Sequence, residues 1–277
     1  MAIIKFFEHG KIDPQFKNQI ADIINNVLDS IENNVIFLEV HLFSTLADLT
    51  AYYTKEVSEI GVQTSDIFFA MHDAWRGYPR ISICLELLKD LPKSVWIGGI
   101  IHELGHAILH GSIEYYMFSP PSELTSLTRK YDLNIEYIYR ILYLLSIAIK
   151  DYEVTNLFIN TKFEESQYPF IKYILQVSDE EIQSWRLSWS KYMRILHLLT
   201  IYKTLACAKP MLNTKYRNDI NKLINSAINY LPPKYQKMIL SLLNQLEKLH
   251  GNISQKLNML CSASINRLIK PILKEKI

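Results

Sequence analysis

Cysteine is scarce in this sequence, with three residues among 277. Cys84, Cys207 and Cys261 lie far apart and form no Cys-x-x-Cys pair, and an odd number cannot all pair within one chain. This usage excludes a disulfide framework as the main source of stability. A reducing, cytoplasmic compartment is therefore the expected location.

Long apolar runs are also absent. The most apolar stretch, Ile135–Ile149, is interrupted by Glu136 and Arg140, and its uncharged part covers only Ile141–Ile149. A membrane-spanning helix needs about 20 apolar residues, so this stretch predicts a helix buried inside the protein. The first ten residues contain no apolar core of the kind found in signal peptides. No membrane partner is expected.

The chain lacks a marked excess of charge of either sign. Thirty Lys and Arg residues face 28 Asp and Glu residues, for a formal net charge of +2, which gives no electrostatic case for a nucleic-acid partner. Only 8 glycines and 10 prolines are present, and 49% of the residues are hydrophobic. This composition is typical of a folded, helix-rich protein rather than a disordered one. Nothing in it indicates an oligomeric state.

The hydrophobic pattern changes near residue 111. Before that point it predicts, in order, helix, strand, helix, strand, strand and helix, at about residues 14–32, 35–43, 44–60, 66–72, 80–87 and 93–111. Gly61 would end the second helix. Beyond residue 111 the pattern is almost wholly helical, with segments at about 119–131, 134–160, 178–208, 215–230, 233–250 and 253–274. The sequence therefore predicts an α+β fold that is predominantly helical, with a small mixed sheet packed on the helix at 93–111.

The helix predicted at residues 93–111 carries the pentapeptide His102-Glu103-Leu104-Gly105-His106. Two histidines four residues apart lie on one helical face, about one turn from each other, so both imidazoles can reach a single ion. Glu103 is offset by about 100° around the helix axis. That position keeps it out of the ligand pair but close enough to act on a water molecule at the metal.

A catalytic zinc site usually takes three protein ligands, and a carboxylate on a later helix is a common third. Asp151 and Glu153 follow the uncharged run at 141–149, where a helix that passes through the core presents polar groups. They are about 200° apart around the helix, so at most one can face the ion. Asp151 continues the apolar face of the helix and is favoured, with Glu153 as the alternative.

Further residues on or near the predicted metal helix have more than one interpretation. Gly98-Gly99 lowers helix propensity and indicates that a neighbouring segment approaches closely. His110 shares the face of the pair but lies about 12 Å from His102 along the axis, too far for the same ion. It is predicted to be a polar helix end, or alternatively a contact to a metal ligand or substrate. His72 is predicted to be structural, or alternatively to pair with Asp73 as an element of the site.

Two features could serve a substrate. The strand at residues 80–84 is a candidate sheet edge along which an extended peptide adds by backbone hydrogen bonds, with an ordinary half-buried strand as the alternative. Tyr115, Tyr116 and Tyr152 are candidate hydrogen-bond donors to an oxyanion.

The chain resembles a zincin metallopeptidase of the gluzincin type. The resemblance rests on the pentapeptide at 102–106 and on Asp151-Tyr152-Glu153-Val154, which is similar to helix motifs of small intracellular metallopeptidases, and it covers about residues 35–160. It implies a Zn²⁺ cofactor held by His102, His106 and either Asp151 or Glu153, with Glu103 as the general base and a peptide or protein as substrate. Residues 1–167 would then form the zincin-like core, and residues 168–277 a helical C-terminal region beginning near Tyr168-Pro169.

Two other functions stay open at this point. A binding or regulatory protein could retain a zincin core without peptidase activity and use its helical C-terminal half to hold a partner. Alternatively, the histidine pair could be a coincidence in a purely structural helical protein.

Overall fold

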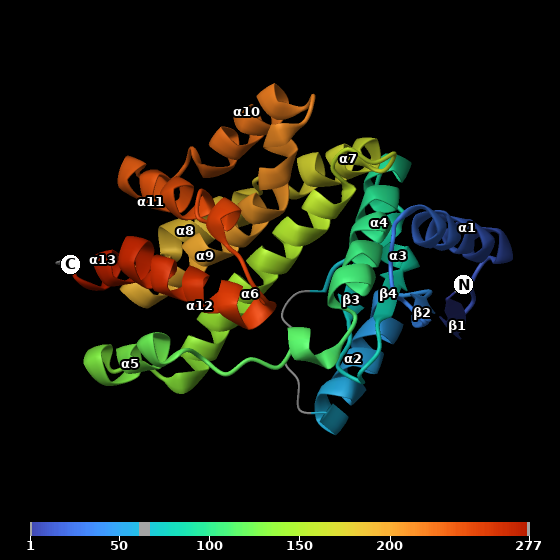
Figure 1. The fold of residues 1–277 in the computed structure, drawn as a ribbon, viewed down its shortest axis with the longest axis horizontal. Coiled ribbons are helices and arrows are strands. Elements are labelled where there is room, and N and C mark those ends of the chain that lie inside the picture. Colours follow the sequence, from blue (N-terminus) through green and yellow to red (C-terminus); the bar gives the residue numbers. More distant parts are fainter. Residues whose placement is uncertain (1, 61–66, 276–277) are drawn as a thin grey trace. The chain divides into compact units, whose positions relative to one another are not determined.

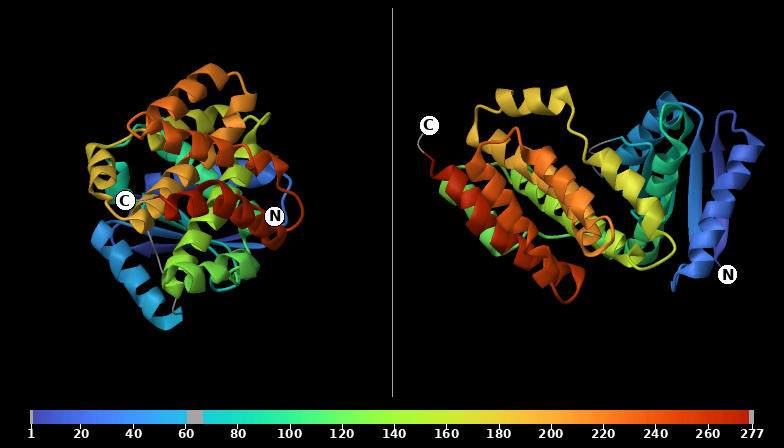
Figure 2. Two further views of the ribbon diagram at one scale, coloured as in Figure 1. Left: turned by 90° about the vertical axis from the view of Figure 1, so that its left-hand side faces the viewer. Right: turned by 90° about the horizontal axis from the view of Figure 1, so that it is seen from above.

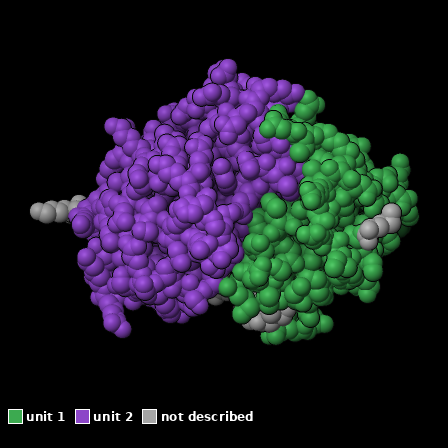
Figure 3. Space-filling view, in the orientation of Figure 1, with its two compact units in different colours: residues 1–117, 160–170 green, residues 118–159, 171–277 purple. Residues whose placement is uncertain are grey.

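The computed structural model describes residues 2–60 and 67–275 (Figure 1). The chain divides into two compact units, which are coloured separately in Figure 3. Unit 1 comprises Met1–Met117 and Asn160–Phe170, and unit 2 comprises Phe118–Ile159 and Ile171–Ile277. The fold is α+β and predominantly helical, as predicted, and the four-stranded sheet lies in unit 1.

The sheet has the strand order β1-β2-β4-β3. The strands are β1 (Ile3–His9), β2 (Phe37–Phe43), β3 (Ala70–Asp73) and β4 (Arg80–Cys84). The pairs β1–β2 and β2–β4 are parallel, whereas β3 is antiparallel to β4, so the sheet is mixed as predicted. The sequence analysis missed β1, because its apolar residues come in adjacent doublets and do not alternate with polar ones.

Helices cover both faces of this sheet. On one face, α2 (Leu46–Ile60) packs on β2, and its Tyr53 and Leu49 join a buried cluster with Phe43 and Cys84. On the other face, α4 (Lys93–His110) contacts β3, β4 and α1 (Pro14–Ser30). The short helix α3 (Leu85–Leu88) follows β4 where the strand had been predicted to continue.

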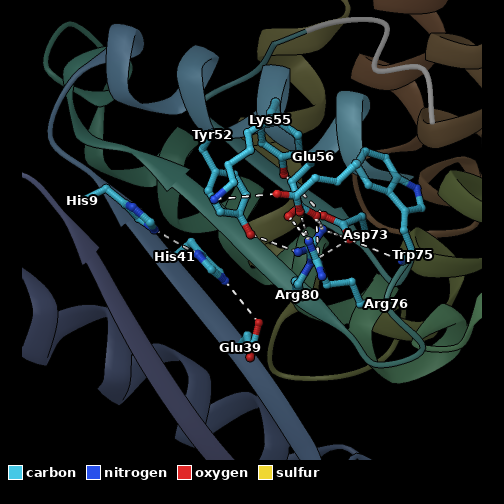
Figure 4. A network of polar contacts seen from close by, with 12 residues as sticks. His9, Glu39, His41, Tyr52, Lys55, Glu56, Asp73, Trp75, Arg76 and Arg80 are labelled. Carbon is cyan, nitrogen blue, oxygen red and sulfur yellow. Dashed lines mark hydrogen bonds and ion pairs between the residues drawn. The ribbon is translucent and has the colours of Figure 1, made fainter. Parts of the chain in front are cut away.

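An ionic network lies between α2 and the sheet (Figure 4). Arg80 of β4 is only 2% exposed and pairs with Asp73 and Glu56 at 2.8 Å each. Its Nη1 also donates to the Tyr52 hydroxyl at 2.9 Å. The network joins α2, β3 and β4 through a single guanidinium group.

A chain of imidazoles lies beside this network on the same face (Figure 4). The His9 Nε2 and His41 Nδ1 atoms are 3.0 Å apart, and His41 Nε2 lies 3.3 Å from a Glu39 carboxylate oxygen. Burial lowers the pKa of His41 to about 4, although Glu39 opposes this shift. The His41 imidazole is therefore neutral at physiological pH.

Unit 2 is built from helices (Figure 2). Its longest helix, α6 (Ile135–Phe158), packs along α9 (Lys191–Ala208), and the apolar stretch 141–149 is largely buried within α6, as predicted. The remaining helices are α5 (Ser122–Tyr131), α8 (Asp179–Leu187), α10 (Arg217–Ile228), α11 (Pro233–Leu243), α12 (Ile253–Ser264) and α13 (Lys270–Leu273), with a π-helical segment at Ile265–Ile269. No helix in the described part of the chain is both long and apolar enough to cross a membrane.

The structure also differs from the prediction in the C-terminal part of the chain. The single helix predicted at 178–208 is two, because Ser190 caps a new helix by accepting the Met193 backbone N–H. The helix predicted at 233–250 ends at Leu243. The boundary predicted between residues 167 and 168 lies inside α7 (Glu164–Ile174), and α6, predicted to belong to the first domain, clusters with the helices of unit 2. The predicted helix stop at Gly61 and strand start at Asp66 lie outside the described residues.

Candidate metal centre

The two motif histidines lie on α4, one turn apart. His102 is 3% exposed and His106 is 8% exposed, because this helix is apolar on nearly every side. Their ring centroids are 5.0 Å apart with an interplanar angle of 80°. Glu103 is half-buried on the adjacent face. The helical period thus brings the imidazole pair together as the sequence predicted.

The close approach predicted at Gly98-Gly99 is confirmed. A Cβ atom at Gly98 would lie 2.3 Å from the Ser166 carbonyl oxygen and 2.8 Å from Phe170 Cβ. At Gly99 it would lie 2.4 Å from the Phe69 ring. Gly98 therefore lets the first part of α7 lie directly against α4, next to the histidines, while Gly99 makes room for the Phe69 ring.

Replacing Gly98 with alanine is expected to destabilise the protein by about 1–3 kcal/mol, because the new methyl group must displace a backbone carbonyl. Alanine is the better helix former by about 1 kcal/mol, so helix propensity alone predicts the opposite sign. Urea unfolding of the two proteins measures the difference. A higher unfolding midpoint for Gly98→Ala would show that α7 is not held in place by this contact.

Gln167 of α7 fixes the orientation of the His102 ring. The side chain is fully buried, and its Oε1 lies 3.4 Å from His102 Nδ1 while its Nε2 donates to the Gly98 carbonyl oxygen at 3.1 Å. The second bond fixes which end of the amide faces the imidazole, so the carbonyl oxygen accepts from Nδ1–H. Nε2 is then the atom that His102 presents to an ion.

His110 makes the equivalent contact to His106. It is 1% exposed, and its Nδ1 lies 3.2 Å from His106 Nδ1. α4 ends at His110, next to Gly111, as predicted, and the side chain is buried against His106 rather than exposed. The structure agrees with the alternative, a contact to the side chain of a predicted metal ligand.

Asp151 and Glu153, the two acids predicted as a third ligand, both lie on α6. His102, His106 and Asp151 offer two imidazoles and a carboxylate, a set of donors that could hold a metal ion. Glu153, the alternative third ligand, is not part of this set and pairs instead with Lys256. Two imidazole nitrogens and one carboxylate oxygen suit Zn²⁺, which leaves a fourth position for water, and the same donor set also suits non-haem Fe²⁺.

The sequence analysis did not foresee the surroundings of His72. In β3 the side chains alternate, so Asp73 faces α2 while His72 faces α4. The His72 ring is stacked 5.9 Å from that of His106, and its Nδ1 is 2.7 Å from the Tyr116 hydroxyl. Strand periodicity could have separated His72 from Asp73, but only the fold places it beside a histidine of α4.

The strand at residues 80–84 is not a sheet edge. It forms β4, which is paired on one side with β2 and on the other with β3. The expectation that a substrate adds to it is therefore wrong, since its backbone hydrogen-bonding groups are already used.

Comparison with known protein families, curated proteins and solved structures finds no match for this chain.

Proposed function

We propose that this protein is a zinc-dependent metallopeptidase of the zincin type. The observation that carries the proposal is the pair of His102 and His106 on one face of α4, with Glu103 on the turn that joins them. Asp151 is the acid that we propose as the third ligand. The contacts of Gln167 and His110 support it, because both engage Nδ1 and leave the same ring atom, Nε2, to face the ion.

Glu103 is the general base in this proposal, and later the general acid. A bound zinc ion would polarise the substrate carbonyl and lower the pKa of a water molecule toward neutrality. The Glu103 carboxylate would accept a proton from that water as its oxygen attacks the peptide carbon, and would then donate the proton to the leaving amine nitrogen.

Tyr116 is the strongest of the three tyrosines considered as oxyanion donors. Its hydroxyl is fixed by His72, whose ring lies against His106. Tyr115, by contrast, packs edge-on against His110.

Elemental analysis of the purified wild type beside two carboxylate variants tests the proposal. The wild type is expected to contain about one zinc per chain. Asp151→Ala is expected to lose most of this metal, because two imidazoles alone bind zinc weakly. Glu153→Ala is the matched control and is expected to retain it, because Glu153 lies outside the group.

Three outcomes would contradict the proposal or part of it. A wild type without stoichiometric metal would favour the structural interpretation of the histidine pair. Metal loss from Glu153→Ala but not from Asp151→Ala would show that Glu153, and not Asp151, is the third ligand. A zinc-loaded wild type that cleaves no member of a broad peptide library would favour a binding protein over a peptidase.

A further inference from the structure

His110 lies one helical turn beyond His106 on α4, and the Nδ1 atoms of the two rings face each other. Their Nδ1 atoms are 3.2 Å apart, and both side chains are more than nine-tenths buried. Two nitrogens at this distance share one hydrogen, because one must donate and the other accept. The contact therefore requires one of the two neutral rings to carry its proton on Nδ1 and the other to carry its proton on Nε2.

We infer that His110 is a positioning residue for the metal centre, accepting the Nδ1–H of His106 so that Nε2 of His106 faces the ion. The inference rests on the proposed metal site. A neutral imidazole that ligates through Nε2 carries its proton on Nδ1. His110 must then offer a lone pair at Nδ1 and carry its own proton on Nε2.

The opposite assignment does not fit the geometry. If His106 ligated through Nδ1, the ion would lie about 2 Å from that atom on the side of His110. His110 Nδ1 lies only 3.2 Å from His106 Nδ1, so the ion would clash with it. The Tyr115 ring, packed edge-on at 5.0 Å, helps to hold the His110 ring in this position. His110 thus serves His106 as Gln167 serves His102, and a ligand histidine commonly depends on such an acceptor.

Two substitutions at position 110 distinguish the loss of the hydrogen-bond acceptor from the loss of the volume of the ring. Leucine fills the space but accepts no hydrogen bond. Asparagine places an amide oxygen close to where His110 has Nδ1, and so can still accept from His106. Removing such an acceptor typically lowers metal affinity by about 10- to 100-fold.

The experiment measures Zn²⁺ affinity by competition with a chelator, together with the absorption spectrum of the Co²⁺-loaded proteins. His110→Leu is expected to bind Zn²⁺ about 10- to 100-fold more weakly than the wild type and to show an altered Co²⁺ spectrum. His110→Asn is expected to recover most of the affinity. His9→Leu is the matched control, because it removes an imidazole–imidazole contact of the same kind, with His41, and should leave the affinity unchanged.

Equal affinities for the wild type and His110→Leu would overturn the inference while leaving the metal site in place. Equal losses in both His110 variants would also overturn it, because the acceptor would then not be what matters. A wild type that binds no metal would remove the metal site and this inference together.

Nitrogen NMR of the zinc-loaded wild type needs no variant to fold. The expected spectrum has His106 protonated at Nδ1 and His110 protonated at Nε2. A proton on His110 Nδ1 would contradict the inference directly.

Discussion

Replacing Glu103 with glutamine is expected to reduce peptide hydrolysis by about 10²- to 10⁴-fold, the usual contribution of a positioned general base. Glutamine has nearly the same shape but cannot accept the proton of the attacking water. Because Glu103 is not one of the grouped ligand residues, the zinc content should not change. The measurement is kcat/KM on a peptide substrate alongside elemental analysis of the same preparation.

The matched control for this variant is Glu32→Gln, the same change at an exposed glutamate that follows α1. It should leave both activity and zinc content as in the wild type. Full activity of Glu103→Gln with zinc still bound would show that the proposed mechanism is wrong, even though the metal site exists.

Replacing Arg80 with methionine is expected to destabilise unit 1 by about 3–5 kcal/mol. The substitution leaves the carboxylates of Asp73 and Glu56 without the guanidinium that joins them, and Asp73 is only 3% exposed. Burial raises the pKa of Asp73, and Arg80 opposes that shift, so the variant loses the charge that stabilises the ionised carboxylate.

Urea unfolding and hydrogen exchange of β3 and β4 measure this loss. Lys55→Met is the control, since it removes a basic side chain from α2 whose partner Glu59 is exposed and 3.7 Å away. Exposed pairs contribute about 0–1 kcal/mol, so the control should unfold nearly as the wild type does. A similarly small effect at Arg80 would mean that water or rearrangement satisfies the two carboxylates.

The sequence could predict the helix that carries His102 and His106 because the information is local. An α-helix places residues four apart on one face, so His102 and His106 had to lie together once α4 formed. The same period excluded a face shared by Asp151 and Glu153. The α+β class followed from the change between strand-like and helical patterns near residue 111, although β1 escaped because its doublets do not alternate.

The contacts that other elements make with the two histidines of α4 could not be predicted from the sequence. Gln167 lies in a stretch that had been predicted to be a domain boundary, and it reaches His102 because Gly98 of α4 lets α7 approach closely. His72 needed both the strand alternation and the packing of β3 on α4 before it could lie beside His106.

What the sequence determined by itself is that His102 and His106 share one helical face with Glu103 beside them, and that Asp151 and Glu153 do not share a face, since backbone periodicity alone fixes these positions. The tertiary structure decided that Gln167 contacts His102, that His72 lies beside His106 and which strands form the edges of the sheet. Those outcomes depend on contacts between residues far apart in the chain, and packing, not local periodicity, selects such contacts.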